Sequence, residues 1–189
     1  MDNFNGNVGS MEGTSTLKNA NVGDYIQIGR YPQTANGDIQ PIEWQVLAIE
    51  ENKMLLISKY GLEARRFDGS SNDWWNSEII EWLNSDFGNK AFNEEEKKYI
   101  SRKFLLSKEE AEEYFANNEV RKCKVTEYAI ENGAFVGDYG YTCWWLRSSF
   151  GGFPYSSYHV DYVLTDGNFS HYSADYSGGV VRPALWIEF

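Results

Sequence analysis

Hydrophobic and polar residues alternate along the first third of the chain in the way expected of β-strands. Apolar residues take every second position of 42–49, which places them on one face of a strand. A polar turn separates this segment from the apolar run 54–58, so the two segments predict a hairpin, and a shorter strand is predicted at 24–30. Because the second strand of the hairpin is apolar on both faces, we expect it to lie centrally in its sheet or beneath helices.

The pattern then changes to the period of amphipathic helices. Residues 77–87 place apolar side chains along one side, with Asn76 or Ser77 as the expected N-cap. Capping-box spacing begins two further helices, at 93–100 and 107–115. We interpret the acidic runs near their starts as solvated helix ends, where carboxylates suit the helix dipole, rather than as a docking surface.

The order of the elements predicts the fold class. After Ala129 the chain becomes rich in glycine and aromatic residues, so strands are followed by helices and then by strands again. This order predicts an α+β protein with a mostly antiparallel sheet and two to three helices. The length of 189 residues fits one domain. We expect that domain at 22–189, after a flexible lead-in at 1–21 that is rich in Asn, Gly, Ser and Thr.

Two apolar ends enclose an unusual window in the C-terminal part of the chain. The ends are Trp144–Arg147 and Val181–Trp186, and the window extends from Ser149 to Leu185. Lys, Glu, Gln, Met and Trp make up 42 of the 189 residues, yet none of them occurs in this window. Turn composition accounts for its Gly and Asp, but not for its many Tyr and Phe residues. Tyr combined with Ser, Gly and Asn is typical of antibody-like binding surfaces.

Charge and hydropathy exclude several classes of partner. The net charge of −11 and the pI near 4.6 argue against nucleic acid and against anionic membrane surfaces. No stretch approaches the roughly 18 apolar residues of a spanning helix, so we expect no membrane insertion. The N-terminus lacks the order of a signal peptide. The location therefore stays open between the cytoplasm and display on a cell or phage surface.

Several motifs together resemble a known family. They are VGDYIQIGRYPQ, IEWQVLAI, LLISKYGL, EWLNSDF, FLLSKEEAEEYF and, most specifically, WWLRSS and VVRPALW. The chain resembles, over about 22–189, a bacterial domain family of unassigned function. Its members look like C-type-lectin-fold proteins of the formylglycine-generating-enzyme-like subgroup, and they recur as variable proteins of diversity-generating retroelements. One departure is visible, because residues 100–104 are short where relatives often carry an insertion.

The resemblance implies a mechanism for the unusual window. Such retroelements mutate adenines, commonly in Asn codons, and the residues then reachable exclude Lys, Glu, Gln, Met and Trp. These are the five types that the window lacks. The resemblance therefore implies a hypervariable protein that binds an unidentified protein or glycan ligand, without a cofactor, in an oligomeric state that stays open. The alternative is an ordinary member with a fixed surface, as in a structural or envelope-associated domain.

The expected binding surface comes from two segments, 150–162 and 168–178. The first set of ligand-binding residues comprises Tyr155, Ser157, Tyr158, His159, Asp161 and Tyr162. The second set comprises Asn168, Phe169, His171, Tyr172, Asp175 and Tyr176. We expect them to form one exposed patch, so that replacing Tyr158, Tyr162, Phe169 and Tyr172 together by Ser should preserve the fold.

Other residues of this region are expected to be fixed. The scaffold between the two sets should comprise Val160, Val163, Leu164 and a turn at Asp166–Gly167. The two arginines of the apolar ends are expected to hydrogen-bond to carbonyls or a carboxylate. With the tryptophans they form a set of structural residues that we expect to be buried together: Trp144, Trp145, Arg147, Arg182 and Trp186.

Fixed catalytic chemistry is not indicated. The two histidines, His159 and His171, both lie in the window, and the sequence has no phosphate loop, metal-spaced His/Cys cluster or G-x-S-x-G elbow. We therefore expect no enzyme, with a relative of the formylglycine-generating oxidases as the less favoured alternative. Cys123 and Cys143 are predicted to be free, buried thiols. No metal site is expected, because the carboxylates of the window are too dispersed for calcium; they are Asp161, Asp166 and Asp175.

Overall fold

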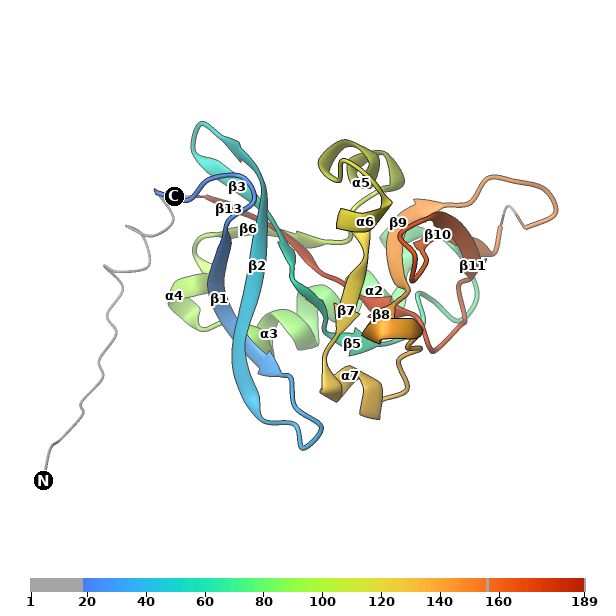
Figure 1. Ribbon diagram of the computed structural model, residues 1–189, viewed down its shortest axis with the longest axis horizontal. Coiled ribbons are helices and arrows are strands. Elements are labelled where there is room, and N and C mark those ends of the chain that lie inside the picture. The colour runs from blue at the N-terminus through green and yellow to red at the C-terminus, as the bar shows by residue number, and fades with distance from the viewer. Residues whose placement is uncertain (1–18, 156, 189) are drawn as a thin grey trace, which may run out of the picture.

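The computed structural model describes residues 19–155 and 157–188. The predicted lead-in, residues 1–21, lies outside the described residues except for its last three positions. The described part is a mixed α+β structure with mostly antiparallel strands, as predicted, but it has three sheets rather than one and more helices than the two to three expected. Two five-stranded sheets lie toward opposite ends of the long axis, and a small three-stranded sheet lies between them (Figure 1).

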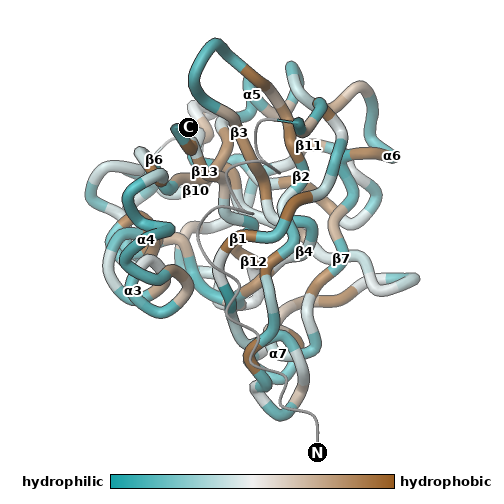
Figure 2. The backbone as a smooth tube through the Cα atoms, turned by 90° about the vertical axis from the view of Figure 1, so that its left-hand side faces the viewer, coloured by the Kyte–Doolittle hydropathy of each residue, from teal (hydrophilic) through white to brown (hydrophobic). Residues whose placement is uncertain are grey.

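The first sheet contains the predicted hairpin. Its strand order is β1-β2-β3-β13-β6, and each neighbouring pair is antiparallel. Because β3 is central, its residues are buried on both faces, which confirms the expectation from its apolar run. Hydrophobic stretches follow the strands, whereas the turn between β2 and β3 is hydrophilic (Figure 2). The bounds are β1 Tyr25–Pro32, β2 Ile39–Glu50, β3 Lys53–Ser58, β6 Ile100–Phe104 and β13 Ala184–Glu188.

The second sheet carries the unusual window. Its strand order is β11-β10-β9-β12-β5, in which β12 pairs with β9 in parallel and the other pairs are antiparallel. Its bounds are β5 Glu63–Ala64, β9 Trp144–Ser149, β10 His159–Val163, β11 Phe169–Ser173 and β12 Val180–Val181. The third sheet consists of β4 Tyr60–Gly61, β7 Cys123–Val125 and β8 Tyr141–Thr142.

The helices are short. The three that were predicted begin at their predicted N-cap residues. The hydroxyl of Ser77 accepts a hydrogen bond from Ile80 N–H, and both predicted capping boxes form, at Asn93 with Glu96 and at Ser107 with Glu110. The α-helices are α2 Glu78–Trp82, α3 Gly88–Ala91, α4 Glu94–Lys97, α5 Lys108–Tyr114, α6 Asn118–Arg121 and α7 Glu127–Glu131. A π-helical segment, Leu83–Phe87, joins α2 to α3, and 3-10 turns occur at Trp74–Asn76 and Asp138–Gly140.

One helix prediction is wrong in its extent. The helix expected at 93–100 ends at Lys97, and Ile100 already begins β6. This strand pairs with β13 at the edge of the first sheet, where Ile100 lies opposite Ile187. Pairing with the C-terminal strand supplies backbone hydrogen bonds that a longer helix would forgo, and the local helical pattern gives no indication of that distant partner.

The apolar segment Val181–Trp186 links the two large sheets. Within Val181–Trp186, Val181 belongs to β12 of the second sheet, whereas Ala184 begins β13 of the first. Arg182 lies between them and is 3% exposed. Its Nε donates to the carbonyl of Ser58 at 2.9 Å, and its guanidinium lies 5.0 Å from the ring centroid of Trp144. A buried guanidinium thus fixes the crossing between the sheets.

The expectation that five structural residues are buried together is only partly right. Trp144 and Trp145 are fully buried, but Arg147 and Trp186 are half-buried. Arg147 is tied elsewhere, because its guanidinium donates to the carbonyl of Leu105 at 2.6 Å and forms a two-point ion pair with the Glu110 carboxylate. Trp186 points away from its buried neighbours on β13 and lies beneath Lys53 Nζ, 4.7 Å from its ring centroid.

Cys123 and Cys143 are free and buried, which confirms the prediction for both thiols. Burial raises the pKa of each thiol above its ordinary value. Among the described residues, no helix has the length and apolar character needed to span a membrane.

Candidate functional site

The β10–β11 hairpin is the framework of the predicted surface. Its cross-strand pairs put His159, Asp161 and His171 on one face of the sheet, and Tyr162 and Tyr172 on the other. The hairpin turn is closed by a hydrogen bond from the N–H of residue 164 to the carbonyl of residue 168 at 2.9 Å. The predicted scaffold turn is therefore present, and its glycine, at position 167, has φ +82°.

The predicted surface residues differ widely in exposure. Six of them are exposed: Tyr155, Ser157, Tyr158, Asn168, Tyr172 and Asp175. Four are half-buried: His159, Phe169, His171 and Tyr176. Two are buried, Asp161 at 9% and Tyr162 at 2% exposure. The expectation that the whole set faces solvent is therefore wrong for these last two residues.

Tyr162 belongs to the core. Its ring centroid lies 4.8 Å from that of Trp145, which is fully buried, and burial raises the pKa of its hydroxyl strongly. The reason is its place in the sheet. β10 is an internal strand between β9 and β11, and Tyr162 packs there on Trp145 within the hydrophobic core.

Asp161 is buried on the opposite face, toward α5. Burial raises the pKa of its carboxyl group, an effect that Lys108 opposes and Glu109 strengthens. Within the part of the chain that the structure describes, its carboxylate accepts no hydrogen bond. A substitution here changes a buried charge rather than a free surface group.

Asn168 and Phe169 lie at the far end of the hairpin from Tyr158. A strand of five residues spans about 17 Å, so the predicted residues do not form one contiguous patch. The Phe169 ring packs under the guanidinium of Arg121, at 3.9 Å from its centroid. Asn168 accepts a hydrogen bond from the side chain of Asn118 at 2.5 Å. Both residues therefore fix the hairpin turn to α6.

The near end of the hairpin gathers a cluster of aromatic and imidazole rings. Phe150 stacks on His171 with ring centroids 3.7 Å apart, and Tyr155 stacks on His159 at 4.4 Å. The two imidazoles meet through their Nδ1 atoms, which are 2.7 Å apart. Tyr158 lies 6.0 Å from His159. We call these five residues the ring cluster.

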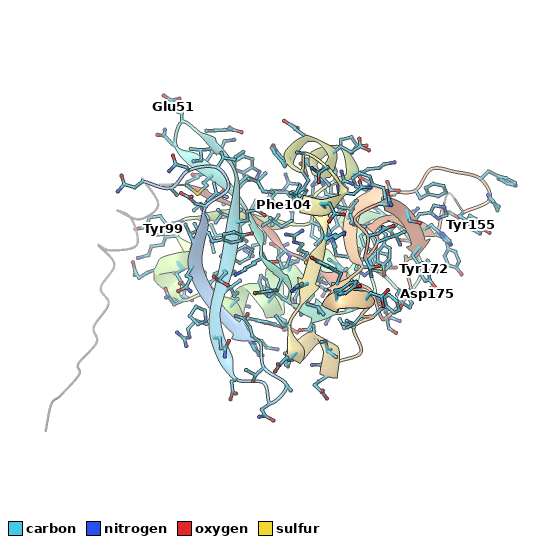
Figure 3. The ribbon with its side chains drawn as sticks, viewed as in Figure 1. Glu51, Tyr99, Phe104, Tyr155, Tyr172 and Asp175 are labelled. Atoms are coloured by element: carbon cyan, nitrogen blue, oxygen red, sulfur yellow. The ribbon has the colours of Figure 1, made fainter. Side chains whose placement is uncertain are left out.

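A second group of rings lies on the other face of the hairpin. Tyr172 stands between Tyr162, at 5.9 Å, and Tyr176, at 4.5 Å between ring centroids. Tyr172 is 46% exposed, as are Tyr155 and Tyr158 of the ring cluster. Tyr155, Tyr172 and Asp175 project from the same end of the molecule (Figure 3). The exposed residues therefore surround the outer end and edge of the second sheet.

Hydrogen bonds to backbone carbonyls hold the outer end of the second sheet in place. The side chain of Asn72 donates to the carbonyl of His159 at 2.8 Å, and the Ser149 hydroxyl donates to the carbonyl of Asn72 at 2.7 Å. The carbonyl of Ala174 accepts from the N–H groups of Phe67 and Asp68. The bonds to the His159 and Ala174 carbonyls use main-chain atoms of the hairpin region, so they do not depend on its exposed side chains.

The predicted set of ligand-binding residues leaves out three aromatic residues of this region. Phe153 is 95% exposed, and Phe150 completes the ring cluster. Trp75 is 70% exposed, three residues after the Asn72 that holds His159. Its neighbour Trp74 is buried, so the adjacent pair of tryptophans was the signal that one ring would face solvent.

The electrostatic setting of the ring cluster favours neutral imidazole. The pKa of His159 is lowered by burial and by His171, and Asp175 opposes that shift. No group of three or more His, Cys, Asp or Glu side chains in the described ranges is placed to hold a metal ion.

An open hollow lies elsewhere on the molecule. Its volume is about 760 Å³, and it lies by the tip of the β2–β3 hairpin, at the end of the molecule opposite Tyr155 (Figure 3). It is open to solvent and is lined by Glu50, Glu51, Asn52, Lys53, Tyr99 and Glu188. The candidate surface is therefore a projecting set of rings rather than the wall of this hollow.

Comparison with known proteins gives a family. No curated protein and no solved structure matches the chain. Residues 51–103 and 99–189 match a family described as a domain of unknown function, DUF6273. Because these matches cover most of the sequence, the chain belongs to the DUF6273 family.

Proposed function

We propose that this protein is a ligand-binding module, in which a C-type-lectin-like scaffold displays a diversified surface as in variable proteins of diversity-generating retroelements. The observation that carries the proposal is the exposure of four rings on the connection between β9 and β10 and on the edge strand β11: Phe153, Tyr155, Tyr158 and Tyr172. Exposed aromatic groups in such number mark interaction sites. Tyrosine supplies a large and rigid contact at a low entropic cost.

The anchoring of the hairpin supports a surface that can change. Asn72 and the N–H groups of residues 67 and 68 hold the hairpin through main-chain carbonyls. Substitutions at Tyr155, Tyr158 or Tyr172 leave those hydrogen bonds intact. A diversified protein needs this separation, because core substitutions destabilise by kilocalories whereas free surface positions stay within about ±0.5 kcal/mol.

The packing of Tyr162 and Phe169 against other residues reduces the set of positions that we propose to be variable. Both residues fall in the window that lacks Lys, Glu, Gln, Met and Trp, yet they pack on Trp145 and Arg121. The proposed binding residues are therefore the exposed rings with Ser157 and Asp175. The proposed activity is binding of a protein or glycan, since planar tyrosine faces with adjacent polar groups suit both.

A matched pair of variants tests the binding role. Tyr155, Tyr158 and Tyr172 are replaced together by Ser, and the control replaces Tyr25 and Tyr139, which are 52% and 90% exposed elsewhere. Each protein is applied to a glycan array and to a displayed random-peptide library. We expect probes selected by the native protein to lose at least tenfold in affinity for the triple variant and to bind the control unchanged. Equal binding to all three proteins would refute the proposed surface.

The DNA sequence around the gene tests whether the surface is diversified by a retroelement. A retroelement leaves a second, near-identical copy of the 3′ end that differs only at adenines, beside a reverse transcriptase gene. Finding this copy with its differences at the codons of Tyr155, Ser157, Tyr158 and Tyr172 would support the proposal. Without such a copy, the surface is fixed and the structural or envelope-associated alternative gains.

A further inference from the structure

The two histidines of the ring cluster meet head-on. Their ring centroids are 5.0 Å apart, but their Nδ1 atoms are only 2.7 Å apart, so the two nitrogens point at one another. In a hydrogen bond of this kind one nitrogen donates its proton and the other must be unprotonated to accept it. The contact therefore holds one proton between His159 and His171.

This contact joins two parts of the molecule. His171 is stacked by Phe150 at an interplanar angle of 16°, and His159 is stacked by Tyr155 at 19°. Phe150 and Tyr155 belong to the segment that connects β9 to β10, whereas His171 lies on β11. His159 itself begins β10, so the pair of imidazoles offers two ring faces on the hairpin, on which Phe150 and Tyr155 of the connecting segment stack. The described residues of this connecting segment are 150–155 and 157–158.

We propose that His159 and His171 form an acid-sensitive latch, which holds the stacked rings of Phe150 and Tyr155, and with them the connecting segment, on the hairpin until both imidazoles are protonated. A first proton is compatible with the latch, because a charged imidazole still donates Nδ1–H to a neutral one. A second proton leaves two donors and no acceptor. It also places two positive charges in contact, so the rings must separate.

The charged groups around the two histidines influence the pH at which the latch opens. Asp175, in the turn after β11, favours protonation of His159, while burial and His171 lower the pKa of His159. Asp161 on β10 lies opposite His171 and has its own neighbours on α5, namely Lys108, Glu109 and Glu112. Tyr155 and Tyr158 face His159 from the segment itself. The two carboxylates near the imidazole pair are therefore those of Asp175 and Asp161. The Asp161 carboxylate is buried and interacts with Lys108.

The sign of the pH effect follows from the lowered pKa of His159. The native state favours the neutral ring, so its contribution to stability is fully present above the unfolded histidine pKa of about 6.5. That contribution is lost as pH falls from that value through the folded pKa. We therefore expect residues 150–158 to loosen in mild acid while the rest of the domain stays folded.

The latch has a consequence that rests on the proposed function. Tyr155 and Tyr158, two of the proposed contact residues, lie in the segment that the latch holds. A ligand bound through these rings at neutral pH would be released in mild acid. A diversified surface with this pair would thus combine recognition with acid-dependent release.

The test observes the latch directly and without a ligand. Histidine ring signals and backbone ¹⁵N relaxation are followed by NMR from pH 8 to pH 5 in the native chain and in the His171→Gln variant. Glutamine keeps an acceptor for His159 but cannot be protonated. We expect two macroscopic titration steps separated by more than about one pH unit in the native chain. The heteronuclear NOE of residues 150–158 should be lost with the second step, and this loss should be absent in the variant.

Other outcomes are equally decisive. Two independent single titrations near 6.5, or NOE values for residues 150–158 that do not change across the second step, would overturn the latch. Tyr139→Ser serves as the control, because it removes an exposed tyrosine outside the ring cluster and should leave both steps unchanged. The proposed function is refuted by a different result, namely that the triple serine variant binds every selected probe as well as the native protein does.

Discussion

The two strands of the β10–β11 hairpin have the same kinds of residue but opposite roles. β10 reads HVDYV and is buried from its second residue to its last, whereas β11 reads FSHYS and is half-buried or exposed throughout. Tyr162 and Tyr172 show the contrast most clearly, since their ring centroids are 5.9 Å apart and their exposures are 2% and 46%. β10 is internal to its sheet and β11 is the edge strand. The buried tyrosine thus lies on the internal strand and the exposed one on the edge strand.

Trp145→Ala should give the largest effect, because it removes the support under β10. Its ring packs on Tyr162 and Phe67, and its Nε1–H donates to the carbonyl of Arg65 at 2.9 Å. Truncation of a buried tryptophan costs roughly 3–5 kcal/mol. Urea unfolding followed by circular dichroism measures the change. A loss below about 1 kcal/mol would show that β10 does not depend on this packing.

Tyr162→Ser should destabilise the domain by about 3 kcal/mol, close to the lower limit for large core truncations. The loss comes from the packing of its ring, so Tyr162→Phe should recover most of the stability. The quadruple serine variant suggested by composition should therefore fail to fold, because it includes Tyr162. A fully stable quadruple variant in thermal melts would contradict the burial of this ring.

Glu110→Ala should have an intermediate effect. The Glu110 carboxylate pairs with Arg147 of β9 and also accepts from Ser107 N–H at 2.8 Å, so it joins α5 to the strand beside β10. Removing it leaves a half-buried guanidinium without its partner, which costs on the order of 1–3 kcal/mol. Glu110→Gln, which keeps a hydrogen-bond acceptor, should cost less. An unfolding free energy of Glu110→Ala equal to that of the native chain would show that the ion pair adds nothing.

The sequence pattern correctly predicted the elements that are determined by residues close together in the chain. The β2–β3 hairpin, the Ser77 cap and both capping boxes depend on residues a few positions apart, and all of them form. The burial of the thiols also followed from their number and spacing. These features need no knowledge of distant partners.

The candidate surface depended on information that the local pattern does not contain. Alternation within β10 and β11 assigns residues to two faces, but it does not reveal that β9 flanks β10 while β11 has no outer neighbour. For the same reason the pattern could not show that Phe169 packs under Arg121, or that His159 meets His171. Such contacts join residues that come together only when the sheets assemble.

Tyr172→Ser should have the smallest effect on stability and the clearest effect on binding. The ring lies on the edge strand, is 46% exposed and contacts Tyr162 and Tyr176 from outside, so its removal leaves the core packing of Tyr162 on Trp145 in place. Surface substitutions of this kind change the free energy of unfolding by about 0.5 kcal/mol or less. Urea unfolding of Tyr172→Ser beside Tyr162→Ser therefore tests the comparison between the two strands directly. If both variants lost the same stability, the difference between the internal and the edge strand would have no energetic meaning, and Tyr172 could not vary freely.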